Sequence, residues 1–188
     1  MRIVHVIEGL HPDRGGPPVV AMSVAAARVR RGQVDRMTRR ANALSIPNGV
    51  DLDAREAPPA GSFRSTYGPL EGRPYFVFLG RLDKIKGLDL LLDAYLLARS
   101  GGSGADLVLV GPDWGEQQAI QGMAARAGIA KHVHCTGPLY DQRKLGALRD
   151  AIALVHRPRY EGFGLAVVEA MSVGTPAVIG ERCLLPAT

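Results

Sequence analysis

The chain has 188 residues, of which 46% are hydrophobic and 22% charged, and its formal net charge is +5. These values are typical of a soluble globular protein and provide one substantial core rather than two. No apolar run approaches the roughly 20 residues that cross a bilayer, which argues against a membrane-spanning segment. The positive charge fits either an ordinary basic protein or one that attracts phosphate-bearing ligands or an anionic membrane surface.

The cysteines and the first residues bear on the compartment. Cys135 and Cys183 form no C-x-x-C pair and lie far apart, so we expect free thiols in a reducing compartment. The opening string M-R-I-V-H-V-I-E-G-L does not resemble a signal peptide, because Glu8 and Asp13 follow its short apolar stretch. We therefore expect a cytoplasmic protein.

The first elements predict a β-loop-α unit. Residues 2–7 are an apolar, β-rich run typical of a buried strand, and a loop containing Gly15 and Gly16 follows. Residues 19–31 are predicted to form a helix, which Gly32 would end.

From Pro74 onward, short apolar strands alternate with helices, which predicts βαβ units and a parallel sheet. The expected strands are 75–79, 107–110, 132–135, 152–155 and 177–179. The expected helices are one after Lys86 with apolar positions 88, 91, 92, 95 and 96, then 116–127, 141–149 with Asp141 as its cap, and 165–173. The fold class is therefore α/β, a Rossmann-like parallel sheet with helices on both faces.

A cationic motif, F-L-G-R-L-D-K-I-K-G at 78–87, follows the first of these strands. Arg81 lies just past the strand end and Lys86 just before the next helix. Ligands of open parallel sheets bind beyond the carboxyl ends of the strands, where two cations would neutralise a diphosphate. The alternative is a solvated pair of surface charges.

The next strand ends in L-V-L-V-G-P-D-W at 107–114. Gly111 is either a residue of a ligand site or part of an ordinary turn, because Gly-Pro-Asp is common turn chemistry. Trp114 would stack on a nucleobase or cap the core, and the sequence does not separate these roles.

An acidic motif, E-G-F-G-L-A-V-V-E-A-M-S-V-G-T-P-A-V at 161–178, holds two carboxylates, Glu161 and Glu169. With Gly164 opening the helix, Glu169 would lie about 7–8 Å further along the axis, while Glu161 stays in the preceding loop. The free backbone N–H groups of Gly164 and Leu165 favour an anion between them. The stretch predicts one site for a sugar, a phosphate and a ribose.

Other polar patterns give no site. We expect no metal at the D-x-D of Asp51 and Asp53, which follows a turn, nor at His132 and His134, which lack a carboxylate or cysteine at ligand spacing. A basic run is a solvated face or a contact with anionic lipid head groups. No aromatic residues interleave with this run, so nucleic acid is not an expected partner; the run comprises Arg28, Arg30, Arg31, Arg36, Arg39 and Arg40.

These motifs together resemble the retaining glycosyltransferases of the GT-B fold, family 4 in particular. The acidic string matches the family's E-x7-E signature and Arg81 with Lys86 its R-x4-K pair. The resemblance implies transfer of a sugar from a nucleotide-diphosphate-sugar donor to a hydroxyl of a glycan or lipid-linked acceptor. It also implies that no metal or other cofactor is needed, and it fits peripheral contact with the inner membrane face.

The resemblance also assigns roles to residues. Arg81 and Lys86 would contact the donor phosphates, Glu161 the hydroxyls of the donor sugar and Glu169 those of the ribose. Glu161, Arg81 and Lys86 are thus the expected catalytic residues. The remaining expected donor-binding residues are Gly15, Gly16, Gly111, Gly162, Phe163, Gly164 and Leu165.

The resemblance finally predicts the domain organisation. The string I-P-N-G-V-D at 46–51 is similar to the segment that leads out of the family's N-terminal domain. Because residues 33–45 hold no further strands and helices, we expect 1–45 to be a remnant of that domain and 46–188 a truncated C-terminal nucleotide-sugar-binding domain. The family's functional histidine in the N-terminal domain has no match. The alternative to an active enzyme is a non-catalytic remnant that at most binds nucleotide or nucleotide sugar.

Overall fold

A five-stranded parallel sheet organises the protein. The computed structural model describes residues 57–161 and 163–180, all of which belong to one compact unit. The strands pair in the order β3-β2-β1-β4-β5, and every pairing is parallel. Their bounds are β1 Tyr75–Leu79, β2 Asp106–Val110, β3 Val133–Gly137, β4 Ala153–His156 and β5 Ala177–Ile179.

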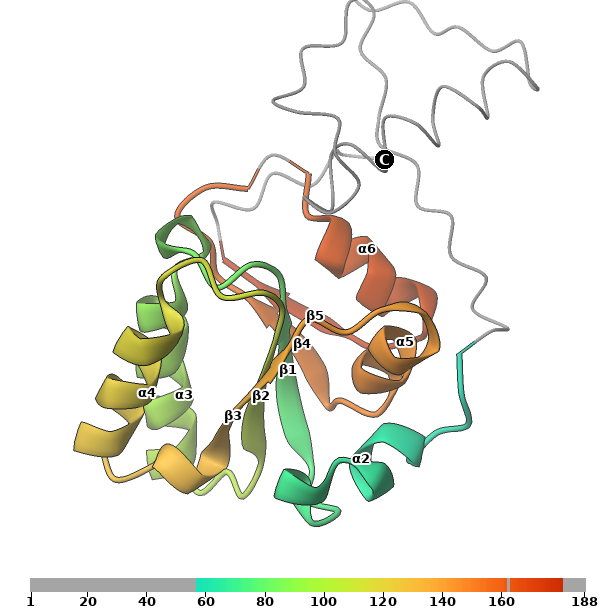
Figure 1. The fold of residues 1–188 in the computed structure, drawn as a ribbon, viewed down its shortest axis with the longest axis horizontal. Coiled ribbons are helices and arrows are strands. Elements are labelled where there is room, and N and C mark those ends of the chain that lie inside the picture. Colours follow the sequence, from blue (N-terminus) through green and yellow to red (C-terminus); the bar gives the residue numbers. More distant parts are fainter. Residues whose placement is uncertain (1–56, 162, 181–188) are drawn as a thin grey trace, which may run out of the picture. The chain divides into compact units, whose positions relative to one another are not determined.

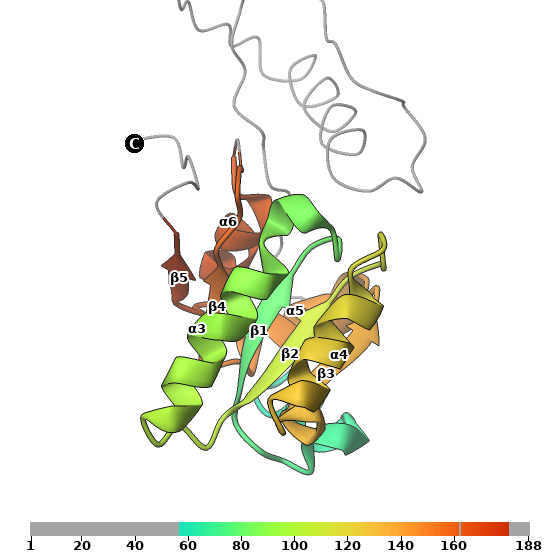
Figure 2. The same cartoon turned by 90° about the vertical axis from the view of Figure 1, so that its left-hand side faces the viewer.

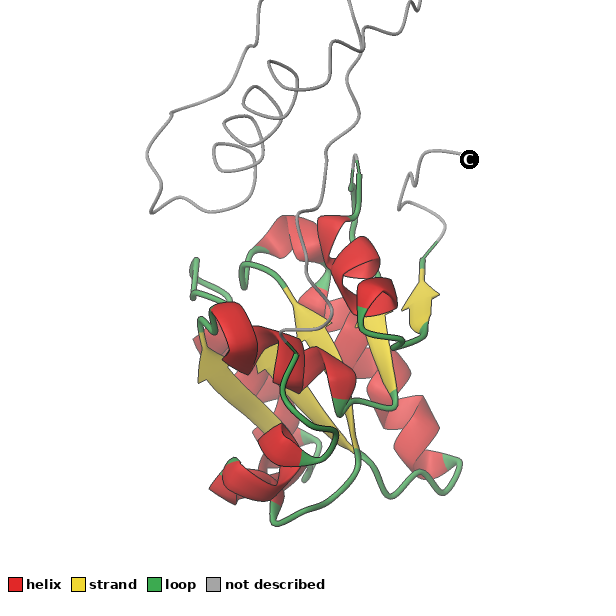
Figure 3. Cartoon of the chain, turned by 90° about the vertical axis from the view of Figure 1, so that its right-hand side faces the viewer, coloured by secondary structure: helices red, strands yellow, loops and turns green. Residues whose placement is uncertain are grey.

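Helices cover both faces of this sheet (Figure 1). Figure 2 looks onto the face covered by α3 and α4, and Figure 3 onto the opposite face, where α2, α5 and α6 pack. The α-helices are α2 Ser62–Thr66, α3 Leu88–Ser100, α4 Gln117–Arg126, α5 Asp141–Arg149 and α6 Leu165–Ser172. The described residues also form three short 3-10 helices, η3 Gly68–Leu70, η4 Lys84–Lys86 and η5 Ala130–His132. The expected α/β fold with helices on both faces is confirmed.

The sequence pattern explains the two layers. All five residues of β2 are buried, as expected for a central strand covered on both sides. The apolar stripe of α3 buries four residues against one face: Leu88, Leu91, Leu92 and Tyr95. The opposite core joins β1 to α5 and α6, and the Tyr75 hydroxyl donates a buried hydrogen bond of 2.7 Å to the Ala147 carbonyl.

The strand order creates a switch point between β1 and β4. From β1 the chain moves outward through α3, β2, α4 and β3. It then returns through α5 to place β4 on the other side of β1. The loops that follow β1 and β4 therefore leave adjacent strand ends in opposite directions. A crevice for a ligand forms at such a point in open α/β sheets.

Several sequence expectations need correction. The helix 116–127 is shorter at both ends in the structure, and β4 runs one residue further than expected, to His156. His132 lies in η5 rather than in β3. Asp141 is not a cap: it is the first residue of α5, with φ +47°, and Tyr140 occupies the cap position. The segment over α2 and η3 carries no predicted element, because neither is long enough to show a period.

A buried charged cluster holds the amino end of the sheet. Asp106, fully buried at the start of β2, receives Arg73 Nε at 3.1 Å. His132 Nδ1 lies 2.9 Å and His134 Nε2 2.7 Å from its two oxygens. Burial raises the pKa of Asp106, but the contacts with His134, His132 and Arg73 more than offset this and hold it below its ordinary value. The two histidines thus share a carboxylate that the sequence spacing did not reveal.

The predicted β-loop-α unit, Gly15 and Gly16 within it, and Cys183 lie outside the described residues. Cys135 is free, as expected, and half-buried. Within residues 57–161 and 163–180, no helix is both long and apolar enough to cross a bilayer.

Candidate donor site

An ion pair joins the two loops at the switch point. Lys86, at the end of η4, places Nζ 2.5 Å from Oε2 of Glu161 in the loop after β4. Both side chains are less than one-fifth exposed. A charged pair with this little solvent around it is screened far less than a surface pair, so it fixes the two loops relative to one another. Both residues were predicted as site residues.

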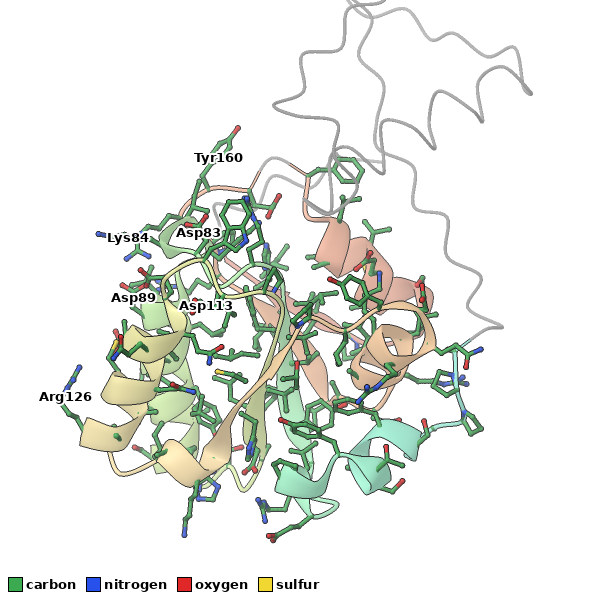
Figure 4. All side chains as sticks on the ribbon, viewed as in Figure 1. Asp83, Lys84, Asp89, Asp113, Arg126 and Tyr160 are labelled. Atoms are coloured by element: carbon green, nitrogen blue, oxygen red, sulfur yellow. The ribbon has the colours of Figure 1, made fainter. Side chains whose placement is uncertain are left out.

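The two loops approach closely because of Gly87 and Arg159. Gly87 has φ +64°, and a Cβ atom there would lie 2.4 Å from the carbonyl oxygen of Arg157. Arg159 donates its backbone N–H to the Ile85 carbonyl at 2.8 Å. Its guanidinium donates two hydrogen bonds, of 2.6 and 2.7 Å, to the carboxylate of Asp89 on α3. Figure 4 shows Asp83, Lys84 and Tyr160, from these same two loops, at one end of the sheet.

His156 is a buried partner of this pair that the sequence reasoning missed. It ends β4, is 1% exposed, and stacks on Phe78 of β1 with ring centroids 6.1 Å apart. Its Nε2 lies 3.3 Å from the same Oε2 of Glu161. Contact with His156 is the largest influence on the pKa of Glu161, followed by burial, which acts in the opposite direction, and by Lys86; the net effect is a pKa well below the ordinary value. Glu161 is therefore a firmly ionised carboxylate.

Gly80, directly after β1, lies close to two predicted site residues, Lys86 and Gly111. A Cβ atom at Gly80 would contact Lys86 Cε at 3.9 Å, and one at Gly111 would lie 1.9 Å from the Gly80 carbonyl oxygen. Gly111 is therefore required by the close approach of two strand ends. Whether it also lines a base-binding pocket stays a prediction.

Arg81 follows Gly80 and stacks on Trp114. The Arg81 guanidinium carbon lies 4.2 Å from the centroid of the Trp114 ring. Hydrogen bonds from Leu82 N to Pro112 O and from Trp114 N to Leu82 O, 2.9 and 3.0 Å long, carry the pairing of β1 and β2 past their ends and bring the two side chains together. Trp114 is 51% exposed, so of the two alternatives the capping of the core is wrong.

The helix after the acidic motif begins where the sequence predicts. Gly164 takes the N-cap of α6 with φ +72° and supplies no side-chain cap. Phe163 and Leu165 on either side of it are half-buried. The Gly164 amide contributes to lowering the pKa of Glu161. Gly162 lies outside the described residues.

Glu169 has a partner from another helix. Its Oε1 lies 3.1 Å from Nζ of Lys144 on α5, and both side chains are about one-fifth exposed. No sequence pattern indicates this contact, because Lys144 lies in an ordinary amphipathic helix. The structure thus places Lys86 and Gly111 against Gly80, Glu161 against Lys86, Arg81 against Trp114 and Glu169 against Lys144.

The amides at the start of α4 are already occupied. The Asp113 carboxylate accepts hydrogen bonds from the backbone of Gly115, Glu116 and Gln117 at 2.8–3.1 Å. Asp83 likewise caps η4 through the Ile85 amide at 3.0 Å. In the part of the chain that the structure describes, no group of three His, Cys, Asp or Glu side chains is placed to hold a metal ion.

Comparisons with known proteins place this architecture in a family. The family model for glycosyl transferases group 1 matches residues 62–187. Phosphatidyl-myo-inositol mannosyltransferase of Mycobacterium tuberculosis is 33% identical over 154 residues, covering 81% of this chain and 38% of that protein. A GDP-mannose-dependent alpha-(1-6)-phosphatidylinositol monomannoside mannosyltransferase of the same organism is 34% identical over 152 residues, covering 76% and 39%. The chain spans about two fifths of the length of these relatives.

A solved structure shares the fold. HepE of Anabaena, determined in complex with UDP and glucose, matches with a TM-score of 0.66 at 21% identity, covering 93% of this chain and 51% of that one. With the family model matching well over half of its residues, the chain belongs to the group 1 glycosyl transferases.

Proposed function

We propose that the described residues form the donor-binding half of a retaining glycosyltransferase that uses a nucleotide-diphosphate sugar. The observation that carries this proposal is the Lys86–Glu161 pair at the switch point of the sheet, on the same loop after β1 that carries Arg81. The two cations would bind the diphosphate, and the N–H groups at the start of α6 would add to them. Glu161 would hold the hydroxyls of the donor sugar, and Glu169 those of the ribose.

The charges suit the reaction that the family implies. As the bond from the anomeric carbon to phosphate lengthens, negative charge grows on the leaving diphosphate and positive charge on the sugar ring. Arg81 and Lys86 are positioned before the reaction to stabilise the first, and ionised Glu161 the second. Removing one such preorganised group typically costs roughly 3–4 kcal/mol of transition-state stabilisation. These cations make a bound metal unnecessary in the proposal.

Each of the two acids is paired with a lysine, which shapes the binding step. A diphosphate at Lys86 would share that ammonium with Glu161, because a lysine has three N–H donors. Ribose hydroxyls at Glu169 would add to the carboxylate, whose oxygens accept several hydrogen bonds, without displacing Lys144. Lys86 thus helps to keep Glu161 ionised, and both carboxylates stay available to accept hydrogen bonds from the ligand.

Calorimetric titration tests the donor site. UDP, GDP, UDP-glucose and GDP-mannose are the probes, because HepE was solved with UDP and glucose and one relative is named GDP-mannose-dependent. We expect one of the two nucleotide series to bind, and Arg81→Ala and Glu169→Ala each to weaken binding by at least tenfold. Equal heats for the intact chain and both variants would remove the donor site. Added EDTA should leave binding unchanged.

The acceptor would be a hydroxyl of a glycan or lipid-linked molecule. The M. tuberculosis relatives are named for phosphatidylinositol acceptors, so vesicles with and without phosphatidylinositol are the first to try. Transfer of labelled sugar would establish the enzyme, and the anomeric configuration of the product would test retention. Cosedimentation with the same vesicles would test peripheral membrane contact.

Binding without transfer would instead support a chain that only holds nucleotide sugar. Transfer requires an acceptor hydroxyl held in line with the anomeric carbon, and the described residues carry only the donor half of such an arrangement. The binding and transfer measurements separate the two functions.

A further inference from the structure

His156 is the one buried side chain at the switch point, within the described residues, whose polar atoms find no hydrogen bond. Its ring is 1% exposed, and neither nitrogen has a hydrogen-bond partner among the described residues. The Nε2 atom is 3.3 Å from Glu161 Oε2, near enough to interact but not aligned as a hydrogen bond. A buried polar group left in this state requires an explanation, because most such groups in folded proteins are paired.

The surroundings of the imidazole ring hold its Nε2 toward Glu161. Phe78 stacks on the imidazole with an interplanar angle of 22°, which limits its rotation. The strand β4 ends at His156, so its backbone is fixed by pairing with Ile179 of β5, whereas Glu161 lies in the loop five residues later. The ring is therefore the rigid member and the carboxylate the adjustable one.

Lys86 and His156 approach the same oxygen of Glu161. The shortest contacts of Lys86 Nζ and His156 Nε2 with Glu161, 2.5 and 3.3 Å, are both with Oε2. A carboxylate whose orientation is restricted in this way presents its remaining acceptor positions in defined directions, and these accept hydrogen bonds from hydroxyl groups. Because the Glu161 side chain remains 18% exposed, the carboxylate has access to a ligand.

We propose that His156 is a positioning residue for Glu161: its Nε2, 3.3 Å from Oε2, restricts the orientation of the carboxylate, and Glu161 is thereby aimed at a hydroxyl of the donor sugar. The sugar hydroxyl rests on the proposed donor site, whereas the contact between His156 and Glu161 does not. His156 touches neither phosphate nor base in this arrangement. Its loss therefore weakens recognition of the sugar and leaves recognition of the nucleotide intact.

Two amide variants of the full chain test the proposal. His156→Gln places an amide nitrogen near the position of Nε2, whereas His156→Asn carries the same amide one methylene shorter and falls short of Glu161. The first measurement is the titration of the Glu161 side-chain carboxyl by carbon-13 NMR, assigned with Glu161→Gln. We expect the midpoint to rise by about one pH unit in His156→Asn and to return toward the wild-type value in His156→Gln. Equal midpoints in all three proteins would overturn the proposal.

The second measurement is calorimetric, with UDP and GDP against UDP-glucose and GDP-mannose. We expect His156→Asn to weaken binding of the nucleotide sugar about tenfold more than binding of the bare nucleotide, and His156→Gln to recover most of the loss. Equal weakening of both ligands would mean general damage to the site and would also contradict the proposal. A wild-type chain that binds no nucleotide would remove the donor site, and the carboxyl titration alone would then decide the role of His156. If His156→Asn does not fold, His156→Leu, which keeps an apolar contact with Phe78, replaces it.

Discussion

Lys86 and Glu161 are 75 positions apart in the chain, yet Lys86 Nζ lies 2.5 Å from Glu161 Oε2. One residue follows β1 and the other follows β4, and the sheet order makes these two strands neighbours. The pair therefore marks the point where the chain reverses direction across the sheet. Its place at the carboxyl ends of the strands makes it the centre of the candidate site.

Removing the Lys86 charge should weaken donor binding while leaving the fold intact. Lys86→Met keeps the apolar stem against Gly80 and deletes the ammonium. A charge-assisted hydrogen bond of this kind is worth about 1.5–3 kcal/mol, so the dissociation constant should rise by roughly 10- to 150-fold. Lys84→Met in the same short helix is the control, because Lys84 is exposed and its side chain makes no hydrogen bond or ion pair among the described residues. Similar losses in both variants would point to bulk charge rather than to a site.

Replacing Gly87 should separate the two loops. Gly87→Ala meets both an unfavourable φ of +64° and a contact of 2.4 Å with the Arg157 carbonyl oxygen. Gly128 has φ +70° but open space around it, so Gly128→Ala has the unfavourable backbone conformation without the steric clash. The backbone strain costs roughly 1–2 kcal/mol in each, and the clash should add about 1–3 kcal/mol to Gly87→Ala alone. Urea denaturation of both variants measures the difference; equal losses of stability would show that the loops tolerate a wider separation.

The Asp106 cluster should make stability depend on pH in a specific sense. Because its carboxyl has a lowered pKa in the folded protein, its contribution is present above its unfolded pKa of about 3.9 and is lost as the pH falls further. Asp106→Asn removes the charge that Arg73, His132 and His134 share, which should cost about 3 kcal/mol at neutral pH.

Urea denaturation of the wild type and Asp106→Asn at several pH values tests this sign. The difference in the free energy of unfolding between the wild type and Asp106→Asn should be largest at neutral pH and should decrease below about pH 4. A gap that stays constant into acid would mean that the carboxylate charge of Asp106 is not what holds this end of the sheet.

Trp114 should act through Arg81. Trp114→Leu removes a cation–π contact worth about 0.5–1 kcal/mol at an exposed site, so donor affinity should fall about two- to fivefold with stability nearly unchanged. In a double-mutant cycle with Arg81→Ala, the two losses should be less than additive, because Trp114 has no further effect once Arg81 is gone. Fully additive losses would instead favour direct stacking of Trp114 on the nucleobase.

The sequence predicted the sheet well because its strands are short apolar runs bounded by turns. For four of the five strands, the predicted first and last residues lie within one residue of the observed bounds. The exception is β3, which begins after His132, because His132 belongs to a 3-10 helix, and ends two residues later than predicted. The site residues on β1 and its loop could be predicted from motif and from position alone. Residues that directly follow a strand of a parallel sheet lie at the carboxyl end of that sheet, where ligands bind.

The contacts that hold the site could not be predicted in the same way. His156 ends an apolar strand, and the only signal available was a polar residue at a strand end. Lys144 meets Glu169 because α5 and α6 pack side by side, which depends on the topology rather than on local pattern. Asp106 meets two histidines 26 and 28 residues later for the same reason.

Chemical-shift mapping of nitrogen-15-labelled protein during titration with UDP-glucose and GDP-mannose tests the central claim most directly. With the donor that binds, we expect the amides of Arg81, Lys86, Gly164 and Glu169 to shift together along one binding curve. The amide chemical shifts of His132 and His134, at the opposite end of the sheet, should not change. Shifts confined to the amino end, or absent from the loops after β1 and β4, would contradict a donor site at the switch point.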